Sequence, residues 1–266
     1  MTSQKKLRAL ITGASYGIGE DFARIFAAEK FDLVLTARSR DKLEALAREL
    51  SQTYRVDVSV IAEDLADPEA PRRIFETLER EGKQIDALVN NAGFGLHGEF
   101  SKLGQKEQLS MIHLNVTALT DLTRFFLPGM LERRLGKILN VASTAAFQPG
   151  PLMAVYYATK AYVLSLSEAL NEEVRGTGVN VTCLCPGPTQ SEFQKRAGMG
   201  DVALFTYASM RSRPVAEAGF KAVMKGKPLV IPGFLNKFMA FTTRLSPRAL
   251  SPRIVHSLQA GRSDKH

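Results

Sequence analysis

The sequence predicts an α/β protein in which a doubly wound parallel sheet is flanked by helices and forms a single domain. Three observations lead to this fold class. Strand-like runs alternate with helical runs along most of the 266 residues, a pattern typical of parallel sheets. A glycine-rich turn follows the first strand-like run. The chemically distinctive residues stand at or just after strand ends, where such sheets bind ligands.

The expected strands and helices follow one another in regular order. The strand-like runs are 7–11, 33–37, 56–61, 87–90, 137–141, 179–184 and 229–231. The helical runs are 17–29, 41–52, 69–81, segments within 106–133, a helix that passes through Tyr156 and ends near 174, and a helix near 215–224. The apolar residues Phe22, Ile25 and Phe26 show the helical spacing in the first of them.

The turn after the first strand contains Gly13, Gly17 and Gly19. Glycine permits positive φ and lets another backbone or a ligand approach closely. The N–H groups at the start of the following helix would face a pyrophosphate. A strand, a glycine turn and a helix in this order predict a nucleotide-binding turn.

Tyr156 and Lys160 are four residues apart, and Ser143 stands thirteen positions before the tyrosine. Residues i and i+4 of a helix lie on one face, so we expect the ammonium group beside the phenol. A cation favours the phenolate of a tyrosine, whose ordinary pKa is about 10. The spacing predicts a general acid, a cation that lowers its pKa, and a serine that holds the substrate oxygen. Tyr-x-x-x-Lys alone occurs by chance on many helices, and the nucleotide-binding turn is the independent second signal.

Six sequence blocks occur in one order along the chain: Thr12-Gly13-x-x-x-Gly17-x-Gly19, Asn90-Asn91-Ala92-Gly93, Asn115, Ser143, Tyr156-x-x-x-Lys160 and Pro186-Gly187-Pro188-Thr189. With these blocks the chain resembles the short-chain dehydrogenase/reductase family over most of its length. The stretch Leu127-Pro128-Gly129-Met130 and the long C-terminal extension resemble, within it, the bacterial relatives of ketoacyl and hydroxysteroid reductases. The resemblance implies a Rossmann-type fold. It also implies a catalytic tetrad of Asn115, Ser143, Tyr156 and Lys160, in which the asparagine helps to position the lysine and a proton-relay water. Ala142 departs from the family pattern, because relatives often have a second serine there.

The residues after the second strand predict the cofactor. A sheet that prefers NAD places an acidic residue there, whereas the 2′-phosphate of NADP calls for a cation. The segment 36–40 contains no acid but includes Arg38, which favours NADP(H), with Ser15 and Ser39 as hydroxyl partners. Some NADP-preferring relatives carry a basic residue where this chain has Tyr16. Alternatively, Arg38 and Arg40 only open a solvated helix.

The resemblance implies further cofactor contacts. Asp64 would bind the adenine amino group, although it could equally cap a turn, and Thr189 would bind the nicotinamide carboxamide, although the Pro-Gly turn could be punctuation. Asn91 and its neighbours would both line the cofactor and steady the sheet. The full set of expected cofactor-binding residues is Gly13, Ser15, Gly17, Ile18, Gly19, Arg38, Asp64, Leu65, Asn91, Ala92, Gly93, Tyr156, Lys160, Pro186, Gly187 and Thr189.

The expected activity is that of an NADP-dependent oxidoreductase acting on CH–OH donors and the corresponding carbonyls. NADPH would give a hydride to a carbonyl carbon while Tyr156 protonates the oxygen. We expect a lipophilic ketone or acyl chain as substrate, beside Phe94, Phe147, Leu152 and an apolar lid at about 190–213. The lid includes Phe193, Met199, Leu204, Phe205, Tyr207 and Met210. A non-catalytic NADP(H)-binding redox sensor or scaffold is the alternative, and the intact tetrad argues against it.

Composition excludes several classes of protein. A hydrophobic content of 45% and a charged content of 23% fit a soluble globular protein. Cys183 and Cys185 point to one face of a strand, as buried thiols. No metal is expected, because the histidines show no ligand spacing. We expect a cytoplasmic protein, since the N-terminus shows no targeting signal, and the family resemblance implies a homo-oligomer. A pI near 9.5 comes with no recognised nucleic-acid motif.

The positive charge is concentrated near the C-terminus. Residues 206–266 contain eleven lysines and arginines and two acids, a net charge of +9, whereas the whole chain carries +8. We divide the chain into a Rossmann-fold domain at 1–233 and a basic amphipathic extension at 234–266. The extension could contact an anionic membrane. Equally, its apolar residues could pack on the domain or on a second subunit.

Overall fold

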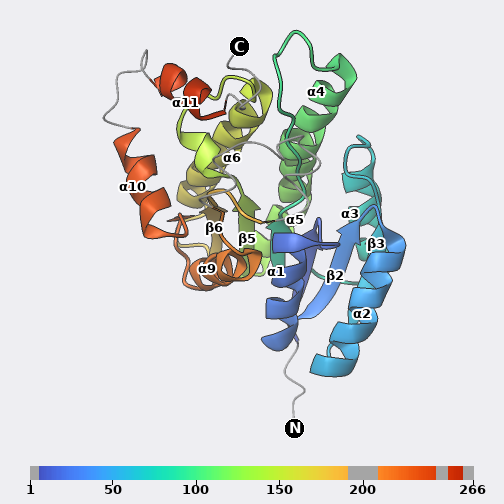
Figure 1. Cartoon of the computed structure of the whole chain (residues 1–266). Helices are drawn as coiled ribbons and strands as arrows, with labels where there is room; N and C mark the ends of the chain where they lie inside the picture. The colour runs from blue at the N-terminus through green and yellow to red at the C-terminus, as the bar shows by residue number, and fades with distance from the viewer. Residues whose placement is uncertain (1–5, 191–208, 244–250, 260–266) are drawn as a thin grey trace.

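A computed structural model describes residues 6–190, 209–243 and 251–259 (Figure 1). Within these ranges seven strands form one parallel sheet in the order β3-β2-β1-β4-β5-β6-β7. The strands are β1 (Arg8–Thr12), β2 (Asp32–Ala37), β3 (Val58–Ala62), β4 (Ala87–Asn90), β5 (Gly136–Val141), β6 (Val179–Leu184) and β7 (Leu229–Val230). The predicted parallel α/β architecture is confirmed, and each expected strand is present.

Helices connect the strands and cover the sheet. They are α1 (Gly17–Ala28), α2 (Arg40–Tyr54), α3 (Ala70–Arg80), α4 (Gln105–Ile112), η1 (His113–Ala118), α5 (Leu119–Glu132), η2 (Thr144–Phe147), α6 (Ala154–Glu173), α9 (Ser212–Met224), α10 (Phe234–Thr242) and α11 (Ser251–Gln259). Two of them are not α-helices, because η1 is a π-helix and η2 is a 3₁₀ helix. The expected helical run within 106–133 is therefore one run with a π-helical segment in its middle.

Successive side chains of the strands point to opposite faces of the sheet, and each face has its own apolar layer. Ala9 and Ile11 of β1 pack with α1, α2 and α9, whereas Leu10 packs with α3 and α5. The alternation follows from the two-residue period of a strand. Because both faces are covered, the strands read as nearly continuous apolar runs.

Aromatic contacts fix α1 against the later half of the chain. The ring centroid of Phe26 lies 4.8 Å from that of Phe220 in α9, and the two ring planes meet at 89°. Phe31 makes a second edge-on contact with Phe26, at 5.1 Å. Such pairs contribute about 0.5–1.5 kcal/mol beyond their area. They hold the first helix, whose start carries the glycine turn, to the helix that precedes β7.

The strand order reverses at β1. The chain runs outward from β1 through β2 to β3, and β4 then pairs with the other side of β1. Ligands of open α/β sheets bind beyond the carboxyl ends of the strands at such a point. The glycine turn after β1 and the Asn91 segment after β4 meet there.

Beyond Gly233, the residues that the structure describes form two short helices, α10 and α11. In Figure 1, α10 lies outside β6, at the opposite edge of the molecule from β3. The division of the chain at residue 233 remains a prediction. Most of the expected lid, including Phe193, Met199, Leu204, Phe205 and Tyr207, lies outside the described residues. Across the described ranges, each helix is too short or too polar to cross a bilayer.

Candidate active site

The turn between β1 and α1 has the geometry that only glycine allows. Gly13 and Gly17 have φ values of +66° and +60°, in the left-handed region that favours glycine. A Cβ on Gly13 would lie 2.9 Å from Nδ2 of Asn91, and one on Gly19 would overlap the carbonyl oxygen of Gly13. The turn is therefore closed tightly onto the start of α1.

Thr12 and Asn91 tie this turn to β4. The Thr12 hydroxyl donates to the carbonyl of Val89 at 3.2 Å and accepts from the backbone N–H groups of Asn91 and Ala92, each at 2.9 Å. Asn91 Nδ2 donates to the carbonyl of Thr12 at 2.9 Å. These bonds give Asn91 and Ala92 a structural role, and they also place both residues beside the glycine turn.

Arg38 and Asp64 come together at the carboxyl ends of β2 and β3. A guanidinium nitrogen of Arg38 lies 3.9 Å from a carboxylate oxygen of Asp64, and the Arg38 side chain is 61% exposed. Asp64 also accepts from the N–H of Ala66 at 3.0 Å, so it does cap a turn. An exposed ion pair contributes at most about 1 kcal/mol, so Arg38 remains open to a stronger anionic partner. The sequence does not indicate this pairing.

Arg40 opens a solvated helix, which is the alternative interpretation of its role. It is the first residue of α2 and forms an i,i+4 pair with Glu44 at 3.6 Å. The arginine therefore lies on the solvated face of the helix.

Ser143, Tyr156 and Lys160 meet between the end of β5 and the start of α6. Tyr156 and Lys160 are buried, and a hydrogen bond joins Ser143 to the phenol. The Lys160 ammonium lies 5.8 Å from the centroid of the Tyr156 ring and donates to the carbonyl of Val141 at 2.9 Å. Ser143 Oγ accepts from the N–H of Ala145 at 3.1 Å, which orients it. The three residues lie together, as their spacing predicts.

The titration of this cluster differs from the sequence-based prediction in one respect. Burial raises the pKa of Tyr156 above its ordinary value, and the hydrogen bond with Ser143 opposes that shift only in part. Burial also lowers the pKa of Lys160 to about 8. The net shift of the tyrosine pKa is therefore upward, and not downward as expected from the approach of Lys160. Desolvation of the phenol prevails, and the ammonium is held by Val141.

Asn115 lies in the π-helical segment η1, and its side chain is fully bonded. Its Oδ1 accepts from the N–H of Phe94 at 3.1 Å, and its Nδ2 donates to the Phe94 carbonyl at 2.9 Å and to Thr159 Oγ1 at 3.1 Å. A Cβ on Gly93 would lie 3.0 Å from Asn115 Oδ1 and 3.5 Å from Lys160 Nζ. Glycine at 93 thus lets the asparagine and the lysine approach one another.

The sequence analysis did not identify two features of this region. Apolar periodicity within 106–133 does not reveal the one-residue offset that makes η1 a π-helix, a feature often found at functional sites. Thr159 is buried, and its hydroxyl donates to the Tyr156 carbonyl at 2.7 Å. In the sequence, Thr159 could be noticed only as a threonine inside a predicted helix, directly before Lys160.

The turn after β6 contacts both Ser143 and α10. The Pro186 carbonyl accepts from the N–H of Thr144 at 2.8 Å and from Ser143 Oγ at 3.4 Å. Thr189 Oγ1 donates to the Gly187 carbonyl at 2.9 Å. A Cβ on Gly187 would overlap the side-chain amide of Asn236 in α10. The expected cofactor residues Pro186, Gly187 and Thr189 therefore lie beside Ser143.

Behind the site, Cys183 and Cys185 are fully buried with their sulfur atoms 3.7 Å apart. They share one face of the strand end, as expected. In the part of the chain that the structure describes, no three His, Cys, Asp or Glu side chains are grouped so that they could hold a metal ion.

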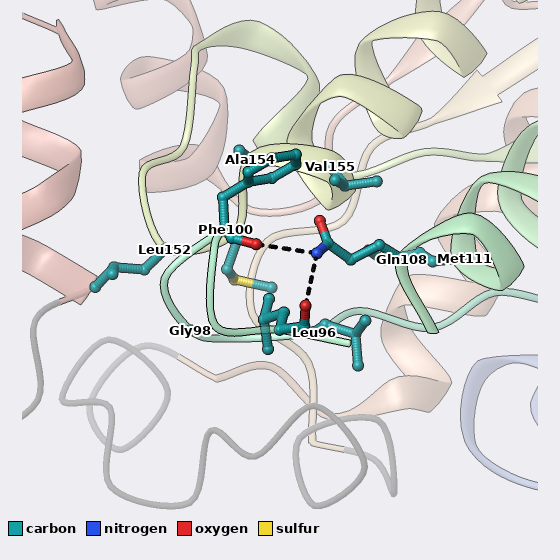
Figure 2. Close-up of a pocket in the computed structure, with 10 residues that line it drawn as sticks. Leu96, Gly98, Phe100, Gln108, Met111, Leu152, Ala154 and Val155 are labelled. Carbon is teal, nitrogen blue, oxygen red and sulfur yellow. Dashed lines mark hydrogen bonds between the residues drawn. The ribbon is translucent and has the colours of Figure 1, made fainter. Parts of the chain in front are cut away.

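A small pocket of about 20 Å³ lies at the start of α6, just before Tyr156 (Figure 2). Gln108 Nε2 donates to the carbonyls of Phe100 and Leu103 at 3.0 and 3.1 Å. Its Oε1 is buried and has no partner among the described residues. The remaining lining is mostly apolar, with Leu96, Gly98, Met111, Leu152, Met153, Ala154 and Val155.

The residues expected to line a substrate pocket are not all together. Leu152 lines the small pocket, and Phe94 packs in the cluster of Met153 and Tyr156. Phe147 packs instead against a separate cluster that contains Cys183. The structure thus separates Phe147 from the other two.

Residues 7–200 match the family model described as short chain dehydrogenase. The chain is 36% identical over 196 residues to sulfoacetaldehyde reductase 2 of Chromohalobacter salexigens, which covers 73% of this chain and 77% of that protein. It spans about half the length of the first curated relatives that it matches.

Two solved structures have the same fold over nearly the whole chain. A short-chain dehydrogenase from Sphingobium yanoikuyae in complex with NADPH is 33% identical, with a TM-score of 0.81, covering 90% of this chain and 93% of that one. The bulky-bulky ketone specific alcohol dehydrogenase from Comamonas testosteroni is 30% identical, with a TM-score of 0.77, covering 91% and 94%.

Proposed function

The chain belongs to the short-chain dehydrogenase/reductase family of oxidoreductases, and we propose that it reduces a carbonyl compound to an alcohol with NADPH, with Tyr156 as the proton donor. The observation that carries this proposal is the cluster of Ser143 with the buried Tyr156 and Lys160 at the carboxyl ends of the strands. A hydrogen bond from a serine, a protonated phenol and a nearby ammonium are the groups that a developing alkoxide needs.

The residues around the glycine turn fit a dinucleotide. A Cβ at Gly13 or Gly19 would fill the tight turn, and the N-terminus of α1 supplies N–H groups and a positive helix dipole for a pyrophosphate. Gly13, Ser15, Gly17, Ile18 and Gly19 would hold that part of the cofactor. When bound, NADPH supplies the hydride.

The protein's own groups then handle the proton and the developing charge. The raised pKa of Tyr156 keeps the phenol protonated at neutral pH, so its proton is available for the substrate oxygen. Ser143 Oγ donates a hydrogen bond to the same oxygen and orients it. After transfer, the phenolate would be attracted by the Lys160 ammonium, which lies 5.8 Å from the centroid of the Tyr156 ring. Lys160 therefore stabilises the phenolate that is left by proton transfer.

The preference for NADP(H) is supported by the end of β2. Arg38 is exposed there, and the segment 36–40 contains no acid to bind the ribose hydroxyls of NAD. A guanidinium pairs with a phosphate through two parallel N–H···O bonds, which outweigh the weak exposed pair with Asp64. The relative from Sphingobium yanoikuyae, which is described with NADPH, agrees with this choice.

The side chains around the small pocket just before Tyr156 support a substrate class. They are mostly apolar, which favours an apolar substituent on the carbonyl. We therefore propose a lipophilic ketone or acyl-chain carbonyl, and the similarity to a bulky-ketone alcohol dehydrogenase supports it.

The proposal is tested by incubating the protein with NADPH or NADH and a panel of aliphatic, aromatic and steroid ketones, and by measuring the loss of reduced cofactor. We expect turnover with NADPH and apolar ketones. Tight NADPH binding without turnover on any carbonyl would instead favour the alternative of a redox sensor or scaffold.

A further inference from the structure

Helix α10 presents its apolar side chains to solvent. Phe234, Phe238 and Phe241 are 87%, 56% and 58% exposed. They recur at spacings of four and three residues, so they form one stripe along the helix. Leu235 and Met239 are also exposed beside this stripe. We call these five residues the α10 apolar face.

The opposite side of α10 holds the helix to the protein through a small and a polar residue. Ala240 is buried. Asn236 Nδ2 donates to the Pro232 carbonyl at 2.9 Å and contacts the Met210 sulfur at 3.4 Å. A surface helix of a globular protein normally turns its apolar stripe inward. In α10 the arrangement is reversed, and a contiguous apolar surface of this kind marks a contact with another molecule or a membrane.

The charge of this part of the chain indicates which kind of partner fits. Lys237 is exposed on α10, and residues 206–266 carry a net charge of +9, whereas the preceding 205 residues carry −1. Two copies that met through this region would bring like charges together. A surface with anionic groups, by contrast, would gain from the same charge.

We propose that α10 binds the surface of a lipid bilayer with anionic headgroups. The α10 apolar face enters the boundary between headgroups and acyl chains, and Lys237 contacts the headgroups. This geometry is that of an interfacial helix lying in the plane of the membrane. The proposal does not depend on catalysis. Because Asn236 lies against Gly187, the bound helix would also hold the turn at 186–189 close to the bilayer.

The test is co-sedimentation of the full-length protein with vesicles of phosphatidylcholine alone or mixed with phosphatidylserine. We expect binding to the mixed vesicles and not to neutral ones, with a progressive loss as salt is added, because salt screens the attraction. The variant Phe234→Ser/Phe238→Ser/Phe241→Ser should lower the bound fraction at least tenfold. Lys237→Glu should weaken binding severalfold.

A matched control removes three other exposed apolar side chains, as Leu109→Ser/Leu135→Ser/Met224→Ser, and should bind as the wild type does. NADPH affinity, measured for every variant, reports correct folding. Failure of the wild type to bind anionic vesicles at low salt would overturn the proposal, and so would equal binding to neutral ones.

Sedimentation velocity without lipid provides a third criterion. If the triple phenylalanine variant dissociates an oligomer that the control retains, α10 is an interface between copies and the membrane proposal is wrong.

Discussion

The hydroxyl of Thr159 joins the two halves of the proposed catalytic cluster. It accepts from Asn115 Nδ2 in η1 and donates to the Tyr156 carbonyl in α6, so it sets the position of the π-helical segment against α6. Thr159 does not touch the reacting atoms, and we regard it as a positioning residue.

Replacing Thr159 with valine keeps its shape and removes the hydroxyl. Asn115 Nδ2 then loses one buried acceptor, at a cost of about 1–3 kcal/mol. We expect kcat for carbonyl reduction to fall about tenfold, while KM for NADPH changes less than about twofold, because misplacement affects the reaction more than binding. Thr159→Ser restores the hydroxyl and should recover most of kcat. Equal rates for the valine and wild-type proteins would contradict this role.

The pKa of Lys160 predicts the pH dependence of reduction. Burial lowers this pKa to about 8, while that of Tyr156 is raised. From roughly one pH unit below the Lys160 pKa to roughly one unit above it, the ammonium loses its proton. The Tyr156 phenol stays protonated over this range. We therefore expect kcat/KM for reduction to be level below pH 8 and to decline above it. Lys160→Met should be slow and lack this decline. A wild-type profile without a break near pH 8 would show that the charge of Lys160 is not needed.

At the level of single residues, the sequence predicted which side chains meet but not how they titrate. The positions of Ser143, Tyr156 and Lys160 follow from helical spacing and from strand ends, which a sequence records. The pKa of Tyr156 depends on burial by residues from several elements, including Met111 in α4, Ala145 in η2 and Val255 in α11. No local pattern carries that information.

Among the elements, the end of β2 is proposed to set the cofactor preference. Arg38→Ala should weaken NADPH at least about tenfold, the size of one charge-assisted bond of about 1.5–3 kcal/mol, and leave NADH within about twofold, because NADH lacks the 2′-phosphate. Arg40→Ala is the matched control, since Arg40 lies two residues after Arg38 and pairs with Glu44. The affinities of this control for NADPH and for NADH should stay unchanged. Titration of nicotinamide fluorescence measures the affinity of each variant for each cofactor. An equal loss of affinity for NADPH and NADH in Arg38→Ala would make Arg38 structural.

Helix and strand positions were predictable because each has a strong local signal, whereas the π-helix η1 was not. The strand after Gly178 was predictable because turn residues stand on both sides of its strand-like run. The structure confirms it at Val179–Leu184. A π-helix keeps helical composition and changes only the hydrogen-bond register, here around Asn115. The bonds from Asn115 to Phe94 and Thr159, which stabilise that register, come from residues distant in sequence.

For the whole molecule, alternation of strands and helices predicted the parallel sheet, and with it the edge at the carboxyl ends of the strands where ligands bind. The orientation of α10 could not be predicted from that pattern. Its phenylalanines were compatible with packing inward, on the domain or on a second subunit, and only the three-dimensional placement of Asn236 and Ala240 shows that they face outward. The outward apolar face is what connects the C-terminal charge with a membrane surface.

The rate of ketone reduction by Tyr156→Phe, compared with the wild type at saturating NADPH, decides whether this site works as proposed. The substitution removes the phenolic proton and keeps the ring. We expect turnover to fall at least about 100-fold, as for loss of a general acid, while the dissociation constant of NADPH stays within a few-fold. A variant that retains most of the wild-type rate would show that Tyr156 is not the proton donor.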